Sequence, residues 1–226
     1  LIRVVLFFTY CLCWMFTSDC ISYVVVSFFF FSSRRPDSRC SGVSWGRGCV
    51  LETGIADVRS VPYSQYTPQY NMNDLKGALK SHGIIYVYFG KELGARREER
   101  ELYTPEGNLD FVKVSKSSVF QSAVERIQKG IDKGINIALM CTEKDPIDCH
   151  RCIMVARQFH ENKYKVGNIL TDGSLQSQDD IEQRLLDLYF PDRIQPNLFE
   201  TGETINELDL IVNAYRLRNK EIGYYL

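Results

Sequence analysis

The chain has 226 residues, of which 45% are hydrophobic, and its formal net charge is −1. This length is sufficient for one α/β domain with a substantial core. The near-neutral charge argues against a protein that binds nucleic acid through a large basic surface.

The eight cysteines fall into two groups along the chain. Five lie within residues 1–53, and the other three are Cys141, Cys149 and Cys152. A secreted protein held together by disulfides would spread its cysteine pairs through the domain. We therefore interpret the second group as free thiols at a site, and we expect a cytoplasmic protein.

Residues 1–53 differ in composition from the rest of the chain. They contain no lysine, and their two apolar runs, 4–16 and 21–31, are separated by a polar segment that includes Asp19. Each run is shorter than the roughly 20 residues that a membrane-spanning helix needs. We interpret the segment as non-native sequence, unstructured or merely hydrophobic, with a membrane anchor and a signal peptide as the alternatives. On the first interpretation the protein has no membrane partner.

From residue 54 onward, hydrophobic periodicity predicts alternating strands and helices. The expected strands are 55–59, 84–89, 135–140 and 164–170, and the expected helices lie near 74–82, 118–131, 149–160, 178–189 and 205–220. Such an alternation is typical of a mainly parallel sheet covered by helices. The sequence therefore predicts a Rossmann-like, three-layer α/β domain over 54–226 that ends in C-terminal helices.

Local signals mark where some of these helices begin and end. Asn73 or Asp74 is expected to cap the first one, and Gly83 to stop it. Capping boxes are predicted at 118–121 and at 204–207.

The most informative stretch is 141–151, which reads Cys-Thr-Glu-Lys-Asp-Pro-Ile-Asp-Cys-His-Arg. It joins a predicted strand to a segment with helical spacing, and such strand–helix junctions are where α/β sheets bind ligands. Helix N-termini also favour thiolates and anions. We predict Cys141, Glu143, Cys149 and His150 as catalytic residues. Cys149 would be a nucleophile or the redox partner of Cys141, and Glu143 an acid or base.

Anion binding is a second interpretation of the same region. Arg59 and Arg151, together with backbone N–H groups at the start of the helix, would hold a phosphate or carboxylate. Asp57 and Ser64 complete the predicted anion-binding residues. The expected ligand is small and anionic or nucleotide-like.

A zinc site is a third interpretation, since thiolates and imidazole are preferred zinc ligands. We predict no metal, because Cys149 and Cys152 would lie on a helix with Cys141 across a turn. A structural zinc ion needs a closed tetrahedral set, and no fourth ligand is evident in the sequence. The sequence leaves the identity of any cofactor unknown.

Several pieces of the sequence occur together in one known family. They are Asp-Val-Arg-Ser-Val-Pro-Tyr-Ser at 57–64, Tyr-Val-Tyr-Phe-Gly-Lys-Glu-Leu-Gly at 86–94, Met-Cys-Thr-Glu-Lys-Asp-Pro at 140–146 and Cys-His-Arg at 149–151. With them, residues 54–172 resemble the domain of unknown function 488 family, and the Cys-x-Glu…Cys-His-Arg element is the most specific part. The resemblance implies a Rossmann-like domain with these motifs at one end of the sheet, but no established reaction.

The chain departs from this family at its beginning. Members begin with a strand that carries a Thr-Ile-Gly-His-Ser-like motif, followed by a helix, and residues 1–53 contain nothing similar. We therefore expect the domain to lack its first strand and helix. Asn168 also stands where a His-Ile pair would be typical.

Our leading hypothesis is a protein that acts on, or binds, an anionic ligand by thiol or acid–base chemistry; whether it is an enzyme stays open. One alternative is a non-catalytic nucleotide- or nucleic-acid-binding module that uses Arg96, Arg97 and the tyrosines of the 63–70 loop. The low net charge gives nucleic acid weak support. The other alternative is a zinc-binding structural protein.

Overall fold

The computed structural model describes residues 3–7, 53–194 and 206–226. Three predicted features lie outside these residues: the remainder of the two apolar runs, the helix expected to be missing before the strand at 55–59, and the N-terminal half of the capping box at 204–207.

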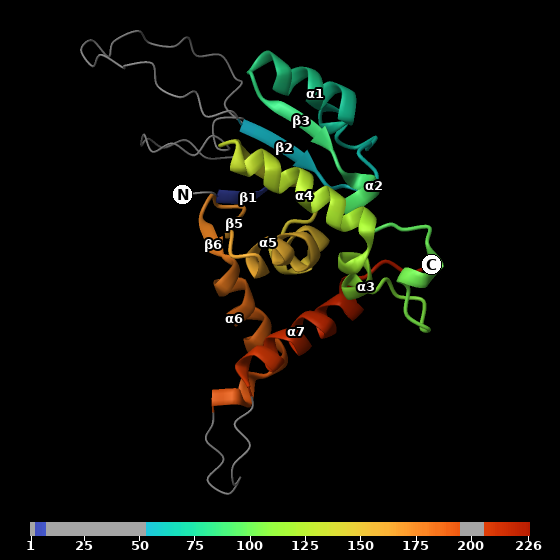
Figure 1. Ribbon diagram of the computed structural model, residues 1–226, viewed down its shortest axis with the longest axis vertical. Coiled ribbons are helices and arrows are strands. Elements are labelled where there is room, and N and C mark those ends of the chain that lie inside the picture. The colour runs from blue at the N-terminus through green and yellow to red at the C-terminus, as the bar shows by residue number, and fades with distance from the viewer. Residues whose placement is uncertain (1–2, 8–52, 195–205) are drawn as a thin grey trace, which may run out of the picture.

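A six-stranded sheet in the order β3-β2-β4-β1-β5-β6 forms the centre of the described fold (Figure 1). The strands are β1 (Arg3–Phe7), β2 (Thr53–Asp57), β3 (Ile85–Tyr88), β4 (Asn136–Met140), β5 (Lys165–Ile169) and β6 (Leu175–Ser177). All neighbouring strands pair in parallel except β5 and β6, which are antiparallel. The predicted α/β class with a mainly parallel, Rossmann-like sheet is confirmed.

The strand β1 lies inside the sheet, between β4 and β5. Its residue Val4 pairs with Ile137 on one side and with Val166 on the other. The expectation that the domain lacks its first strand is therefore wrong. Strand pairing uses backbone groups, so the largely apolar segment Arg-Val-Val-Leu-Phe can fill this position without a Thr-Ile-Gly-His-Ser-like motif. That residues 1–53 as a whole are non-native stays a prediction.

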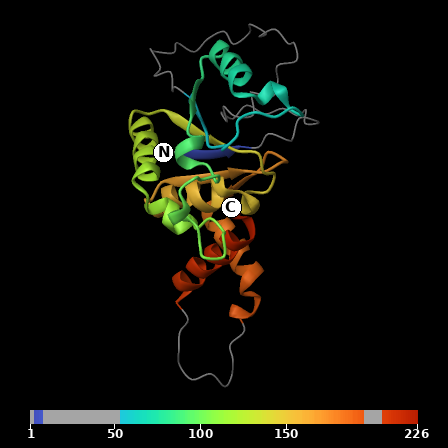
Figure 2. The same cartoon turned by 90° about the vertical axis from the view of Figure 1, so that its right-hand side faces the viewer.

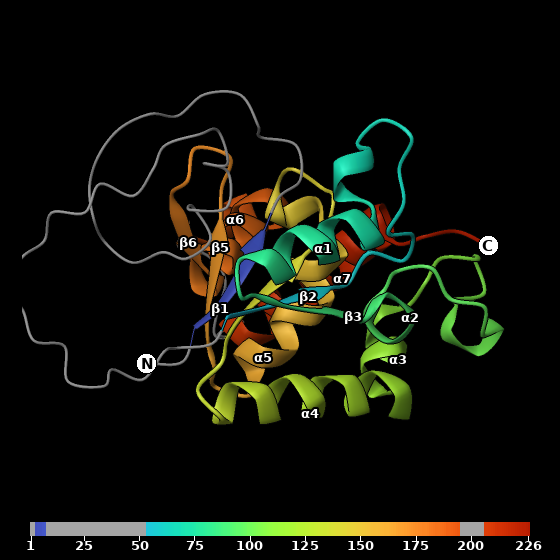
Figure 3. The ribbon, with the colours of Figure 1, turned by 90° about the horizontal axis from the view of Figure 1, so that it is seen from above.

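Helices cover both faces of the sheet (Figure 3). They are α1 (Met72–Ser81), α2 (Gly90–Leu93), α3 (Phe111–Lys116), α4 (Ser118–Asp132), α5 (Arg157–Glu161), α6 (Gln178–Tyr189) and α7 (Glu207–Ile222). The helix α1 lies on one face, and α4 and α5 lie on the other. The helices α6 and α7 pack against each other at one end of the molecule (Figure 2).

Alternating side chains of β2 and β4 reach the two faces, as the pleat of a strand requires. Ile55, Ala138 and Met140 pack with Leu79 of α1. On the opposite face, Leu139 joins the larger core that α4 and α5 cover. The predicted apolar face of α4 is buried there as expected, and consists of Phe120, Ala123, Val124, Ile127 and Ile131.

The helix α6 spans the predicted range 178–189, and the other predicted helix boundaries lie within three residues of the observed ones. The helix α1 begins at Met72 with Asn71 as its N-cap residue, so the predicted caps lie in its first turn. Ser117, not Ser118, caps α4 by accepting a hydrogen bond from the backbone N–H of Phe120. Two neighbouring polar residues can each serve as the N-cap residue, so the sequence alone does not fix the residue at which the helix begins. The stop at Gly83 is confirmed by its φ of 71°.

Among the residues described, no helix combines the length and the apolar character needed to cross a membrane.

Candidate functional site

Two polar clusters follow neighbouring strands at the carboxyl edge of the sheet. The strands β2 and β4 are adjacent, and Asp57 at the end of one pairs with Met140 at the end of the other. We call Asp57, Arg59 and Tyr86 the ion-pair cluster. We call Cys141, Glu143, Cys149 and His150 the thiol cluster.

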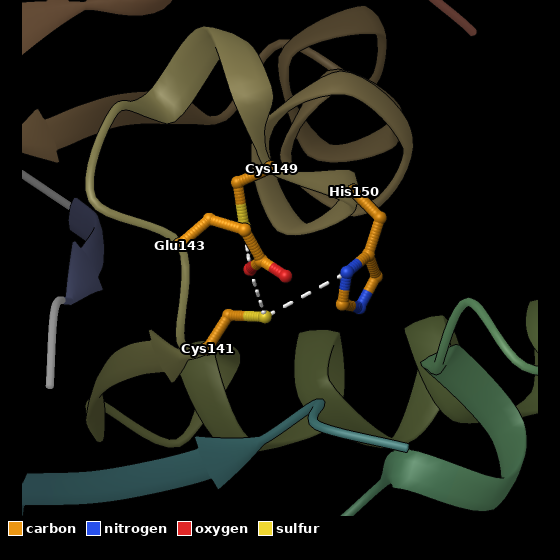
Figure 4. A group of neighbouring side chains, drawn as sticks. All are labelled: Cys141, Glu143, Cys149 and His150. Carbon is orange, nitrogen blue, oxygen red and sulfur yellow. Dashed lines mark hydrogen bonds between the residues drawn. The ribbon is translucent and has the colours of Figure 1, made fainter. Parts of the chain in front are cut away.

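The thiol cluster is organised around one carboxylate oxygen (Figure 4). The Oε2 atom of Glu143 accepts hydrogen bonds from Cys141 Sγ at 2.8 Å and from Cys149 Sγ at 3.0 Å. The Nδ1 atom of His150 lies 3.6 Å from Cys141 Sγ. Each of the four side chains contributes one ligand atom, and these atoms all lie within 4.8 Å of one another. The structure thus brings together all the residues predicted to be catalytic.

A backbone carbonyl orients the imidazole of His150. Its Nε2 atom lies 3.1 Å from the carbonyl oxygen of Val58. A carbonyl only accepts hydrogen bonds, so Nε2 carries the proton of this contact. In the neutral ring, Nδ1 is then the atom with a free lone pair, and it faces Cys141.

Burial, hydrogen bonds and charge together set the protonation states of Cys149 and Glu143. Cys141, Cys149 and His150 are buried, whereas Glu143 is half-buried. Burial raises the pKa of Cys149 well above its ordinary value. Burial also raises the pKa of Glu143, but the charge of His150 and the hydrogen bonds from Cys141 and Cys149 outweigh it and bring the pKa to about 2. At neutral pH, Glu143 is therefore ionised and Cys149 carries its proton.

Two distant arginines hold the loop that connects Cys141 to Cys149. Arg184 of α6 donates to Asp145 Oδ2 at 2.8 Å, and Asp145 in turn accepts from the backbone N–H of Ile147 at the start of a short 3-10 turn, Pro146–Asp148. Arg218 of α7 donates to the carbonyl oxygen of Ile147 at 2.9 Å. The sequence contained no signal for Arg184 or Arg218, because both lie far along the chain from the loop they contact.

The segment that follows the cluster is a π-helical turn, η5 (Arg151–Ala156), which leads into α5. Such π-helical turns are rare in proteins, and those that do occur are frequently found at functional sites. Its residue Cys152 is fully buried and lies 3.7 Å from Gln178 Oε1, outside the thiol cluster.

The ion-pair cluster contains two of the four residues predicted to bind an anion, Asp57 and Arg59. Arg59 donates from Nε to Asp57 Oδ1 at 2.9 Å and from Nη2 to Asp57 Oδ2 at 2.6 Å, and Tyr86 donates to the same Oδ2 atom at 2.6 Å. Arg59 and Asp57 are only 5% and 0% exposed. An anion at Arg59 would therefore have to compete with Asp57.

The remaining predicted anion-binding residues lie apart from that pair. Arg151 is fully buried at the start of η5. The hydroxyl of Ser64 accepts a hydrogen bond from the backbone N–H of Tyr66 at 3.2 Å and so stabilises its own loop. The structure does not assemble these residues into one exposed anion site.

A second group of titratable side chains joins α5 to α6. His160 Nε2 lies 3.5 Å from Asp179 Oδ1 and 3.8 Å from Glu182 Oε1. The Asp179 side chain is 77% exposed, so this group is far more open to solvent than the thiol cluster.

Comparison with known proteins finds a family match, and it covers the range that contains the thiol cluster. Residues 53–157 match the family described as "Domain of unknown function DUF488". The matched range contains both polar clusters and ends just beyond η5. No curated protein and no solved structure matches the chain significantly.

Proposed function

We propose that this chain, whose residues 53–157 match the DUF488 family, is an enzyme that uses Glu143 as a general acid–base. One observation carries the proposal: a single oxygen of Glu143 accepts hydrogen bonds from two thiols. Within the described residues, Glu143 forms no ion pair with an arginine or lysine. Glu143 is ionised at neutral pH, so it can accept a proton from a bound ligand and return that proton later in the reaction, as a general acid–base must.

Acid–base chemistry fits this geometry better than nucleophilic attack by Cys149. Reactive thiols are partly exposed and have a lowered pKa. Cys149 is 0% exposed, and burial raises its pKa. Glu143 is the half-buried member of the cluster, so it is the group that a ligand reaches first.

The proposed ligand is a small molecule bound at the carboxyl edge of the sheet, where parallel α/β sheets hold their ligands. An anionic or nucleotide-like ligand was expected from Arg59 and Arg151. Pairing of Arg59 with Asp57 weakens that argument. The proposal therefore depends on the position of the site and on Glu143, and not on the charge of the ligand. A reducing compartment such as the cytoplasm would keep the cysteine thiols free.

The test compares Glu143→Gln with the wild-type chain on a panel of nucleosides, nucleotides, small amides and small esters, with products followed by mass spectrometry. Loss of a general acid–base lowers turnover by about 10²–10⁴-fold, while ligand affinity changes little. Glu182→Gln is the matched control, because Glu182 is also half-buried but lies outside the cluster. Unchanged turnover in Glu143→Gln would contradict the proposal. Binding without turnover by the wild type would favour the non-catalytic module.

A further inference from the structure

The acid–base role of Glu143 leaves two buried thiols without a function. Cys141 and Cys149 come from opposite ends of a loop, yet both contact one carboxylate oxygen, and an imidazole nitrogen lies on the other side of Cys141. Packing alone would place buried thiols among apolar side chains. This arrangement instead gathers two sulfur atoms, a nitrogen and an oxygen.

We infer that the thiol cluster binds one zinc ion through Cys141, Cys149 and His150, with Glu143 at the fourth position. In a tetrahedral site with the usual Zn–S, Zn–N and Zn–O distances, neighbouring ligand atoms lie about 3.3–3.8 Å apart. The corresponding contacts are 2.8, 3.0 and 3.6 Å. Each would have to change by less than about 1 Å to surround an ion. Thiolate and imidazole ligands also select zinc over magnesium or calcium, which prefer oxygen.

The orientation of His150 supports the inference independently of the thiols. Histidines that bind metals usually donate their second ring N–H to a carbonyl or carboxylate, which fixes the ring and its tautomer. His150 does this with the carbonyl oxygen of Val58, at 3.1 Å. The lone pair of Nδ1 is thereby directed into the cluster before any ion arrives.

The charges of the cluster also balance around a divalent ion. Zinc would replace the thiol protons of Cys141 and Cys149, and the two protons would pass to solvent. Two thiolates and Glu143 then exceed the charge of the ion by one negative charge. Arg151 is fully buried beside the cluster, and its positive charge acts on Cys149. It would offset that excess.

This arrangement assigns a reaction class, which rests on the proposed role of Glu143. Catalytic zinc sites keep three protein ligands and an open position for water. Movement of Glu143 off the ion would open that position. Glu143 would then accept the proton of the bound water, and the resulting zinc-bound hydroxide would attack an electrophilic carbon or phosphorus of the ligand. The bond from that atom to its leaving group would break with its electron pair passing to the leaving group, and Glu143 would return the proton to the leaving group. We therefore infer hydrolysis as the reaction class.

The first experiment measures zinc in the full chain by elemental analysis, and cobalt in the chelator-treated chain by absorption spectroscopy. We expect about one ion per chain and thiolate-to-cobalt charge-transfer bands, as a Cys₂His site requires. In Cys141→Ser and Cys149→Ser, these bands should lose about half their intensity, since each variant removes one of two thiolates. The affinity for cobalt should fall at least about tenfold in each variant. Loss of a residue that only hydrogen-bonds to a metal ligand already lowers metal affinity by about that factor, and these variants remove a ligand itself.

Two matched controls separate this site from the other candidates in the chain. Cys152→Ser removes an equally buried thiol that lies outside the cluster, and His160→Asn removes the imidazole of the exposed group on α5. Both should bind metal like the wild type. An absence of charge-transfer bands, unchanged bands in both Cys141→Ser and Cys149→Ser, or zinc lost equally in His160→Asn would each overturn the inference. Circular dichroism of each variant verifies that it is folded.

The Glu143→Gln variant distinguishes the inference from the proposed function. Metal-free wild-type protein that turns over a ligand, and loses this activity in Glu143→Gln, would overturn the hydrolysis inferred at zinc but retain the acid–base role. A chain that binds cobalt through thiolates, yet keeps full turnover in Glu143→Gln, would retain the metal site and overturn the acid–base role.

Discussion

The ends of β2 and β4 hold two carboxylates in the same part of the fold, but with opposite surroundings. Asp57 is fully buried and accepts hydrogen bonds from the guanidinium of Arg59 and the hydroxyl of Tyr86. Glu143 is half-buried and accepts hydrogen bonds from two thiols. A guanidinium is always charged, so it fixes the charge of Asp57. Thiols can exchange their protons for a metal ion, so the surroundings of Glu143 can change.

The comparison separates a structural carboxylate from a functional one. A buried ion pair with complete hydrogen bonding holds two strand ends and a loop in place, but leaves no group free for a ligand. A half-buried carboxylate that accepts hydrogen bonds from two thiols contributes less to stability and keeps its chemistry available. Substitutions in the two clusters should therefore differ in what they change: stability at Asp57, and binding or turnover at Glu143.

Removal of Arg59 should have the largest effect on stability. Arg59→Leu leaves the charge of Asp57 buried and unpaired, which should lower the free energy of unfolding by about 3–5 kcal/mol. Urea denaturation measures the loss. The double variant Asp57→Asn, Arg59→Leu removes both charges and should recover part of it. A double variant as unstable as the sum of the single variants would mean that the pair itself is not responsible.

Zinc should stabilise the chain through the thiol cluster. A ligand that binds only the folded state adds about 2.7 kcal/mol to the free energy of unfolding when its free concentration is 100 times Kd. We expect this gain for the wild type and for Cys152→Ser, and little or none for Cys149→Ser. Equal gains in all three proteins, measured by urea denaturation with and without zinc, would place the bound ion elsewhere.

Tyr86→Phe should have a smaller effect in the ion-pair cluster. It removes one hydrogen bond to the charged Asp57, and a hydrogen bond of this kind contributes about 1.5 kcal/mol. Arg59 still neutralises the carboxylate, so the loss should stay well below that of Arg59→Leu. Urea denaturation of the two variants under the same conditions makes the comparison direct.

Glu143→Gln should change the stability of the metal-free chain least, by about 1 kcal/mol. Among the described residues no arginine or lysine pairs with Glu143, and the amide oxygen of glutamine can still accept from the thiols. The same substitution should abolish most turnover. A stability loss as large as that of Arg59→Leu would remove the distinction between the two clusters.

The sequence by itself determined four of the strands, the longer helices and the core of the site, but not β1, β6, α2 or α3. Period-two and helical patterns arise from local geometry, so β2, β4 and the apolar face of α4 could be predicted. The thiol cluster lies within ten residues of chain, and Cys141 and Glu143 follow a strand end directly. Residues so close in sequence can meet whatever the rest of the fold does.

Only the tertiary structure decided how these residues are paired. Strand β1 lies between β4 and β5 and pairs with them through backbone hydrogen bonds. No side-chain motif in the sequence predicts this position. Arg59 pairs with Asp57 instead of remaining free for an anion. A carboxylate that is fully buried without a cationic partner would cost much free energy. His150 is oriented by Val58, 92 residues earlier in the chain. Contacts over such separations depend on which strands lie side by side, and local sequence patterns do not encode that.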